Sequence, residues 1–222
     1  MSAAHQDAED AGRHMDGIYR YQRYIYDITR KYFLLGRDTM LESLNPPDGG
    51  TVLEVGCGTG RNLIRAARRY PRAKFYGFDI STMMLETARA NVSSAKLDGK
   101  IAVAEGDATN FSSQDLFGLS GFDRVFISYS LSMIPPWREA IEQGLKAVQP
   151  GGSLHIVDFG QQARLPGLFK KGLEAWLAKF SVEPRPDLEQ ELQAVANRTG
   201  CTLKFERILR DYAHHAILTK PA

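Results

Sequence analysis

The pattern of hydrophobic and polar positions divides the chain into a helical beginning and a longer region where strand-like and helix-like stretches alternate. Between residues 18 and 44, apolar side chains recur every three or four positions, which predicts one or two helices. The turn-forming residues 45–50 end this region. Short β-rich runs follow at residues 51–55, 74–78, 100–104, 122–128 and 153–159, and helix-like runs lie between them at residues 61–70, 82–92 and 137–148. This alternation predicts an α/β domain whose parallel sheet is joined by right-handed crossovers and covered by helices on both faces.

The end of the chain departs from this alternation. Residues 202–209 and 212–219 read as two strands separated by only Arg210 and Asp211. Because so short a connection cannot hold a crossover helix, the two strands are expected to form an antiparallel hairpin at the end of the sheet. The chain shows no internal repeat, so we expect a disordered tail over residues 1–14, a helical segment over residues 15–50 and one α/β domain over residues 51–222.

Composition and charge narrow the functional classes. The 222 residues include 28 basic and 26 acidic side chains, and this near-neutral balance argues against a nucleic-acid partner. Two cysteines, Cys57 and Cys201, cannot supply a four-ligand zinc site, so no metal is expected, and their small number is typical of a reducing compartment. No secretory signal and no apolar run of about 18 residues is evident. We therefore expect a cytoplasmic protein, free or peripherally attached to the inner face of the membrane.

A glycine-rich turn is the first candidate binding feature. The apolar run 52–55 leads directly into Gly56, Gly58 and Gly60, and a predicted helix begins near Arg61. Glycines let the backbone turn sharply and approach a ligand, which the free N–H groups at the start of the helix then face. The G-x-G-x-G spacing is one residue shorter than the G-x-G-x-x-G of dinucleotide enzymes. This favours a nucleotide-like ligand without a pyrophosphate.

Acidic residues end the next two predicted strands. Asp79 lies nineteen residues beyond Gly60, where a carboxylate can accept hydrogen bonds from both hydroxyls of a ribose. Asp107 ends the third strand and is placed to accept a hydrogen bond from an adenine amino group. Each alone is equally well explained as a helix cap. Together with the glycines at successive strand ends they favour a ligand, because open α/β sheets bind ligands at that edge.

From residue 51 to the terminal hairpin these motifs resemble the class I S-adenosylmethionine-dependent methyltransferases. Residues 145–154 are similar to the run into that superfamily's fifth strand, and the closing hairpin is similar to its reversed seventh strand. The resemblance implies a Rossmann-like, doubly wound sheet of seven strands, mostly parallel with an antiparallel C-terminal strand. It also implies S-adenosyl-L-methionine as cofactor, with S-adenosyl-L-homocysteine as product. Besides the three glycines and two aspartates, it implies binding roles for Glu54, Ile80, Ala108 and Ser128.

The segment after the fourth strand bears on the methyl acceptor. No Asn-Pro-Pro-Tyr or Asp-Pro-Pro-Tyr follows that strand, so adenine and glutamine amino groups are poor candidates. Neither cysteine is placed as a nucleophile for cytosine C5 chemistry. Residues 128–137 are instead rich in hydroxyls that can hold an amine by neutral hydrogen bonds. Tyr129 is the candidate catalytic residue, as a proton relay, and packing at the end of the sheet is its alternative role.

Two further segments bear on the acceptor's character. One is an apolar helical face, which fits either an interfacial helix or a helix packed on the sheet, made of Leu165, Leu168, Phe169, Leu173, Trp176, Leu177 and Phe180. The other is residues 13–37, where six Lys or Arg residues alternate with five tyrosines. Such a helix can meet anionic headgroups or nucleic acid, or it can be a solvated face with tyrosines in the core.

A closer resemblance covers nearly the whole chain after about Met15. Residues 26–38, 128–135, 157–160 and 176–180 resemble the bacterial betaine-lipid N-methyltransferases. This resemblance implies trimethylation of diacylglyceryl-homoserine, an aminolipid partner and transient contact with the membrane surface. The alternatives are an N-methyltransferase for another amine, such as phosphatidylethanolamine or a soluble small molecule, and a cofactor-binding protein without catalysis.

Two arginines in the first of these segments suggest a lid. Arg30 and Arg37 are seven residues apart and share a helix face if the helix runs unbroken. Both the homoserine headgroup and the methionine end of the cofactor carry a carboxylate, which arginine can hold by two parallel hydrogen bonds. We therefore expect residues 15–50 to form a helical lid in which Tyr26, Arg30 and Arg37 contact the cofactor. Two solvated surface arginines are the alternative.

Overall fold

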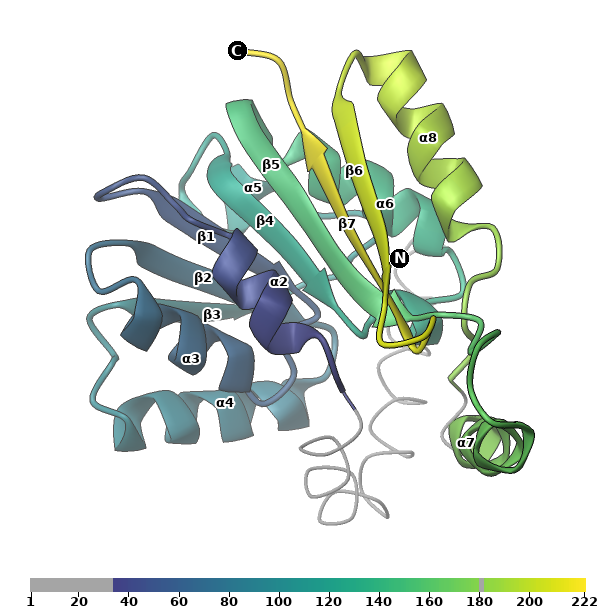
Figure 1. The fold of residues 1–222 in the computed structure, drawn as a ribbon. Coiled ribbons are helices and arrows are strands. Elements are labelled where there is room, and N and C mark those ends of the chain that lie inside the picture. The colour runs from purple at the N-terminus through teal and green to yellow at the C-terminus, as the bar shows by residue number, and fades with distance from the viewer. Residues whose placement is uncertain (1–33, 180–181) are drawn as a thin grey trace, which may run out of the picture.

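The computed structural model describes residues 34–179 and 182–222, which fold around one seven-stranded sheet (Figure 1). The strands are β1 (Thr51–Val55), β2 (Lys74–Asp79), β3 (Ile101–Glu105), β4 (Phe122–Ser128), β5 (Val148–Phe159), β6 (Thr202–Ile208) and β7 (Ala213–Thr219). They lie in the order β3-β2-β1-β4-β5-β7-β6. β1 to β5 pair in parallel, and β7 runs antiparallel to both β5 and β6. The strand order reverses between β1 and β4, which is where a doubly wound sheet binds its ligand.

Helices cover both faces of this sheet. They are α2 (Arg37–Ser43), α3 (Arg61–Arg69), α4 (Thr82–Ser94), α5 (Ser113–Phe117), α6 (Trp137–Lys146), α7 (Gly167–Lys179) and α8 (Leu188–Thr199), with a 3-10 turn at Leu131–Met133. In Figure 1, α2, α3 and α4 lie on one face, and α5, α6 and α8 lie on the other. The predicted α/β architecture with a terminal hairpin is therefore confirmed.

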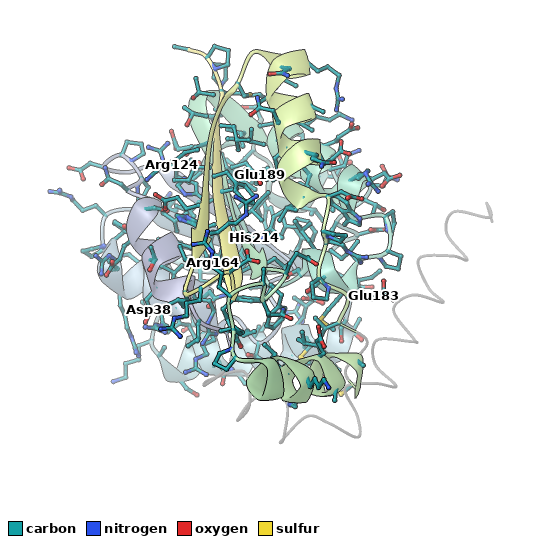
Figure 2. All side chains as sticks on the ribbon, turned by 45° about the vertical axis from the view of Figure 1, so that its right-hand side comes forward. Asp38, Arg124, Arg164, Glu183, Glu189 and His214 are labelled. Carbon is teal, nitrogen blue, oxygen red and sulfur yellow. The ribbon has the colours of Figure 1, made fainter. Side chains whose placement is uncertain are left out.

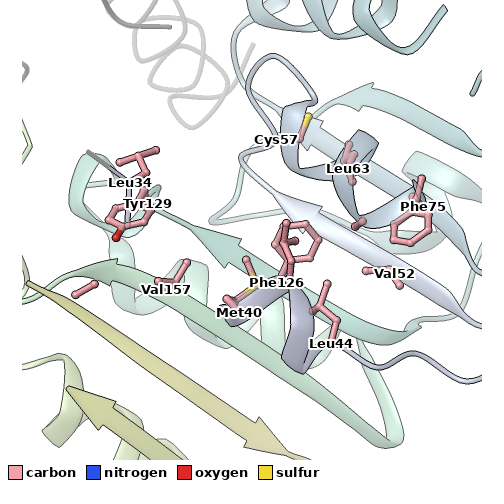
Figure 3. Close-up of a cluster of buried hydrophobic side chains, with 14 of the residues drawn as sticks. Leu34, Met40, Leu44, Val52, Cys57, Leu63, Phe75, Phe126, Tyr129 and Val157 are labelled. Atoms are coloured by element: carbon pink, nitrogen blue, oxygen red, sulfur yellow. The ribbon is translucent and has the colours of Figure 1, made fainter. Parts of the chain in front are cut away.

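Each face of the sheet has its own hydrophobic core because side chains alternate along the strands. Val52, Phe75 and Phe126 point to the face covered by α2 to α4, where they meet Met40 and Leu63 (Figure 3). The neighbouring strand residues point to the opposite face, where α6 and α8 cover them. Alternation of this kind, buried on both sides, produces the nearly continuous apolar strands seen in the sequence.

The N-terminal helix differs from the prediction at Gly36. α2 begins only at Arg37, and Gly36 before it has a φ of 85°, which is left-handed and not helical. A Cβ at Gly36 would meet only the tip of the Ile208 side chain, which can turn away, so the left-handed φ is what favours glycine here. The condition for Arg30 and Arg37 to share a helix face, a helix that runs unbroken up to Arg37, is therefore not met at Gly36.

α2 is held mainly by packing. It buries Met40 and Leu41, and ion pairs join it to α3 between Asp38 and Arg65 at 2.7 Å and between Glu42 and Arg69 at 3.3 Å. These side chains are exposed, so each pair contributes no more than about 1 kcal/mol.

The two helices between β5 and β6 differ in whether they pack on the sheet. α8, which the sequence pattern did not predict, packs on the sheet through its buried residues Leu188, Leu192, Val195 and Ala196. α7 lies off the sheet, beyond the carboxyl end of β5 (Figure 1). Its Leu173 and Leu177 are buried in the same core as Leu34. Of the two interpretations of this helical face, packing is therefore the correct one for these two side chains.

Candidate cofactor and acceptor site

The glycine turn is built as predicted, between the end of β1 and the start of α3. Gly56, Gly58 and Gly60 all have positive φ, at 70°, 52° and 73°. A Cβ on Gly56 would lie 2.7 Å from the hydroxyl oxygen of Ser130, so a side chain there would collide with the segment that follows β4. The turn therefore brings bare backbone to the carboxyl edge of the sheet, as a close-fitting ligand requires.

Asp79 lies at the end of β2 and fastens this turn. Its Oδ2 accepts a hydrogen bond from the backbone N–H of Gly58 at 2.8 Å, and its Oδ1 accepts one from the N–H of Ser81 at 3.0 Å. Because each carboxylate oxygen has two lone pairs, these bonds leave acceptor capacity for ribose hydroxyls. Asp79 thus both shapes the turn and presents charge beside it.

Asp107 follows β3, and its Oδ1 accepts hydrogen bonds from the backbone N–H and the hydroxyl of Thr109, both at 2.8 Å. It therefore caps the turn after β3, as the alternative interpretation supposed. β2 and β3 are parallel neighbours with Asp79 opposite Glu105, so Asp107 follows the same sheet edge. Ile80 is half-buried and Ala108 buried just beyond the two strand ends.

A hollow opens between the glycine turn, α3 and α2. It is lined by Leu34, Arg37, Glu54, Gly56, Cys57, Thr59, Arg61, Asn62 and Ser128. Glu54 is buried and accepts a hydrogen bond from Nδ2 of Asn62 at 2.8 Å. Oδ1 of Asn62 and Oγ of Ser128 are buried without a hydrogen-bond partner among the described residues. Buried polar atoms are rarely left so, and both fit contacts with a polar bound molecule.

Arg37 brings a positive charge to this hollow. Its side chain is only 6% exposed, and its Nε donates a hydrogen bond to the carbonyl of Leu34 at 3.0 Å. Arg37 thus lines the hollow, and its predicted contact with the cofactor stays a prediction. Tyr26 and Arg30, predicted with it, lie outside the described residues.

Tyr129, the candidate catalytic residue, is the first residue after β4. Its φ of 56° is left-handed, and its ring packs edge-on against Phe159 with the centroids 4.6 Å apart. The hydroxyl donates a hydrogen bond to the carbonyl of Leu35, and Figure 3 shows the ring beside Leu34 and Val157. Burial raises the pKa of the phenol well above its usual value. Tyr129 is therefore a neutral group that joins the segment before α2 to the sheet, and its catalytic role stays a prediction.

Cys57 provides no nucleophile. Burial, and then the charges of Asp79 and Glu54, raise the pKa of its thiol well above the usual value, so the thiolate is disfavoured. A thiol of this kind serves packing within the turn.

Asn62 is a site residue that the sequence pattern missed. It lies in the first turn of α3, eight residues after Glu54, and its side chain connects the helix start to the end of β1. A polar side chain in the first helical turn after a glycine motif is the signal that points to it.

Comparison with known proteins gives the family. A family model described as a methyltransferase domain matches residues 47–202. The ubiquinone/menaquinone biosynthesis C-methyltransferase UbiE of Ruegeria sp. is 28% identical over 184 residues, which cover 80% of this chain and 69% of that protein. UbiE of Rhodopseudomonas palustris is 31% identical over 144 residues, covering 61% of this chain and 53% of the relative. These relatives are C-methyltransferases and not betaine-lipid N-methyltransferases.

Solved structures share the fold at low sequence identity. An O-methyltransferase family protein from Burkholderia thailandensis aligns with a TM-score of 0.68 and 18% identity, over 88% of this chain and 59% of that one. Phosphoethanolamine N-methyltransferase 2 of Haemonchus contortus, bound to phosphomonomethylethanolamine and S-adenosylhomocysteine, aligns with a TM-score of 0.62 and 20% identity. That alignment covers 84% of this chain and 52% of the nematode protein. With the family match over most of its length, the chain belongs to the methyltransferase domain family and is an S-adenosylmethionine-dependent methyltransferase.

Proposed function

We propose that the enzyme methylates the amine of a lipid headgroup, converting diacylglyceryl-homoserine into the trimethylated betaine lipid. The observation that carries this proposal is the pairing of a buried cation, Arg37, with neutral hydroxyls at the end of β4, in a site lined by both Arg37 and Ser128. A homoserine headgroup offers the matching groups, a carboxylate for a guanidinium and an amine for hydroxyl acceptors. The likeness of residues 26–38 and 128–135 to the betaine-lipid enzymes supports the same acceptor.

The residues of the site fit a role in alignment more than in acid–base chemistry. When bound, S-adenosylmethionine supplies a methyl group on a positively charged sulfur, so the transfer needs in-line geometry and exclusion of water. Asp79 would hold the ribose, Asp107 the adenine amino group, and Asn62 and Ser128 the polar methionine end. Leu34 would cover the hollow from the α2 side.

Tyr129 would act on the acceptor as a neutral phenol. Its hydroxyl proton is used in the bond to the carbonyl of Leu35, while the oxygen can still accept a hydrogen bond from an amine. Its raised pKa makes a tyrosinate an unfavourable species, and the carbonyl of Leu35 cannot take up the phenol proton, so we assign Tyr129 orientation of the amine and not removal of the amine's proton.

Contact with a membrane surface follows from a lipid acceptor, and we propose peripheral binding at the inner face of the cytoplasmic membrane. Across the described part of the chain, no helix combines the length and apolar character needed to span a bilayer. Leu35 is 42% and Leu209 is 52% exposed. They flank the contact between Gly36 and Ile208, so both lie near the carboxyl end of β5. Exposed apolar side chains at this end of the sheet would suit contact with lipid.

A second candidate is C-methylation of a quinol ring, which the named activity of the curated relatives favours. Attack by a ring carbon needs a deprotonated hydroxyl, and the phenol of Tyr129 and the thiol of Cys57 both have raised pKa values that disfavour a basic form. The hydroxyl-lined site therefore suits an amine better. Phosphatidylethanolamine and soluble amines are further acceptors to test.

Purified enzyme with methyl-labelled S-adenosylmethionine tests these possibilities. We would offer diacylglyceryl-homoserine, phosphatidylethanolamine and a prenylated quinol separately in detergent micelles and identify the products by mass spectrometry. We expect label in mono-, di- and trimethylated homoserine lipid. Label only in the quinol, or only in phosphatidylethanolamine, would overturn the proposed acceptor.

A further inference from the structure

The segment after β4 is held by a side chain from a distant part of the chain. Arg185 lies between α7 and α8, and its Nε donates a hydrogen bond to the carbonyl of Leu131 at 3.1 Å. Its Nη2 donates to the carbonyl of Ile134 at 3.0 Å. One planar guanidinium therefore spans both ends of the 3-10 turn, which fixes the turn's length and orientation.

A buried carboxyl group holds the middle of the same turn. Asp158, at the carboxyl end of β5, is 2% exposed, and its Oδ2 accepts a hydrogen bond from the N–H of Ser132 at 3.1 Å. Its Oδ1 accepts from the N–H of Phe159 at 2.7 Å. The carbonyl of Ser132 accepts in turn from the N–H of Glu183, which lies on the segment between α7 and α8 (Figure 2). Residues 131–134 are thus fixed from β5 and from the segment before α8.

The other end of this segment touches the cofactor turn. Ser128 lines the hollow. The one hydroxyl proton of Ser130 is shared between the carbonyls of Gly56 and Ser128, whose oxygens both lie 3.3 Å from its Oγ. The hydroxyl-rich residues 128–134 therefore run from the first glycine of the cofactor turn to the contacts of Arg185 and Asp158. A shift at the far end would therefore be passed to Ser128, which lines the hollow.

Burying Asp158 is costly for the fold. Removal from water raises the pKa of this carboxyl group and disfavours its charge, and Asp158 does not line the cofactor hollow. A buried polar group that makes well-directed bonds specifies one arrangement of the backbone it contacts. Here that backbone is residues 131–134, which continue from the end of β4 beside the hollow.

We propose that Arg185 and Asp158 are positioning residues that fix residues 131–134 and so determine where the methyl acceptor lies relative to the cofactor. Neither residue lines the cofactor hollow. The proposal deepens the proposed function, on which it rests only for the identity of the acceptor. Its consequence is a separation of effects: loss of either residue harms acceptor turnover and leaves cofactor binding intact.

The kinetic test uses Arg185→Lys and Asp158→Asn, which keep side-chain size. Arg198→Lys is the control. The guanidinium of Arg198, on α8, bonds to Glu142 on α6 at 2.7 Å, but it does not touch residues 131–134. Since small misplacements of a reacting group can cost about 100-fold in rate, we expect kcat/KM for the acceptor to fall roughly 10- to 100-fold in the two variants. The Kd for S-adenosylmethionine, from calorimetry, should stay within about twofold, as should all constants of the control.

Hydrogen exchange followed by mass spectrometry tests the contact itself, whatever the acceptor is. The full-length proteins are compared with S-adenosylmethionine bound. Peptides covering residues 130–136 should exchange faster in both variants than in wild type, and at the wild-type rate in Arg198→Lys. Acceptor kinetics equal to wild type, measured with whichever acceptor the wild type methylates, would overturn the proposal. So would a cofactor Kd weakened as much as kcat/KM, since that is the result of a merely structural role. Inactivity of the wild type toward homoserine lipid overturns only the proposed acceptor.

Discussion

At the scale of single residues, the cofactor site depends most on Asp79, because one side chain serves two purposes. Its carboxylate holds the backbone N–H of Gly58 at 2.8 Å and remains beside the place where a ribose would lie. Asp79→Ala removes both, so we expect S-adenosylmethionine binding to weaken by about 2 to 4 kcal/mol, or roughly 30- to 1000-fold. Calorimetric titration measures this directly. Asp98→Ala, an exposed change away from the site, should bind normally, and equal affinity of the two variants would contradict the ribose assignment.

A substitution at Gly58 tests whether the turn binds the cofactor or has only a structural role. Its φ of 52° is poorly tolerated by a β-branched residue, and a side chain there would stand between backbone and ligand. Gly58→Val should therefore abolish measurable cofactor binding. Gly99→Ala is the matched control, since nothing lies within 4 Å of the added Cβ. If Gly58→Val is folded by circular dichroism and binds the cofactor as wild type does, the turn has only a structural role.

Arg37 can be assigned to one of two carboxylates. Arg37→Ala removes a buried cation from the hollow, so binding of the carboxylate that it holds should weaken by about 1.5 to 3 kcal/mol. A larger Kd for S-adenosylmethionine assigns Arg37 to the methionine end, and a larger acceptor KM alone assigns it to the homoserine headgroup. The comparison is with Arg68→Ala on the exposed side of α3. No change in either constant would show that Arg37 holds neither carboxylate.

At the scale of elements, α2 decides whether Arg37 reaches the site, and a buried polar group fixes this helix to the sheet. The hydroxyl of Ser43, the last residue of α2, lies 2.9 Å from Nδ1 of His155 on β5 and 3.3 Å from Nε2 of His215 on β7. Nε2 of His155 lies 2.8 Å from the hydroxyl of Ser153. These bonds satisfy a buried imidazole that could not be charged without cost.

The fold should therefore lose stability in mild acid. Burial, and then the charges of His215 and Arg124, lower the pKa of His155 to about 3. Its folded pKa lies below the unfolded one, so the unfolded chain takes up a proton first, and stability falls as the pH drops from about 6.5 towards 3. Urea unfolding should show a slope approaching about 1.4 kcal/mol per pH unit from this residue.

His155→Gln isolates that contribution, because it removes the titrating group whatever it does to overall stability. The acidic groups with lowered pKa, Asp211 and Glu206, lose their own stabilisation near pH 4 and below, outside the range of about 5 to 6.5 that we would compare. His215, whose pKa is also lowered, adds to the slope of both proteins. Identical pH slopes for His155→Gln and wild type in that range would contradict the prediction.

At the scale of the whole molecule, the sequence predicted what depends on local patterns. The β1 and β4 boundaries match the apolar runs because both strands are buried on two faces, and the glycine turn follows from residue type alone. α8 was missed although its buried Leu188, Leu192, Val195 and Ala196 recur at the three- and four-residue spacing of an amphipathic helix, so the sequence carried its signal. The contacts of Arg185 with Leu131, 54 positions apart, cannot be found from periodicity. Gly36 shows the opposite case. The helical pattern in the sequence continues through this residue, but its left-handed φ of 85° means that the helix begins only at Arg37.

One sheet with a core on each face should unfold as a unit, so binding at its edge should stabilise the entire fold. The cofactor hollow involves residues from α2, β1, α3 and β4, and unfolding any of them removes the site. At a cofactor concentration of about 100 times Kd, mass action adds about 2.7 kcal/mol to the free energy of unfolding. For a domain of this size we expect scanning calorimetry to show one transition whose Tm rises by about 5 to 10 °C.

The same experiment on two variants shows where that stabilisation originates. Asp79→Ala should lose most of the Tm shift at the same S-adenosylmethionine concentration, because its weaker binding reduces the mass-action term. Arg198→Lys, on the far helix α8, should keep the full shift even if its unliganded Tm is lower. A shift of equal size in wild type and Asp79→Ala would mean that the stabilising ligand binds elsewhere. Two separate transitions, only one of which moves with cofactor, would mean that the two cores do not unfold together.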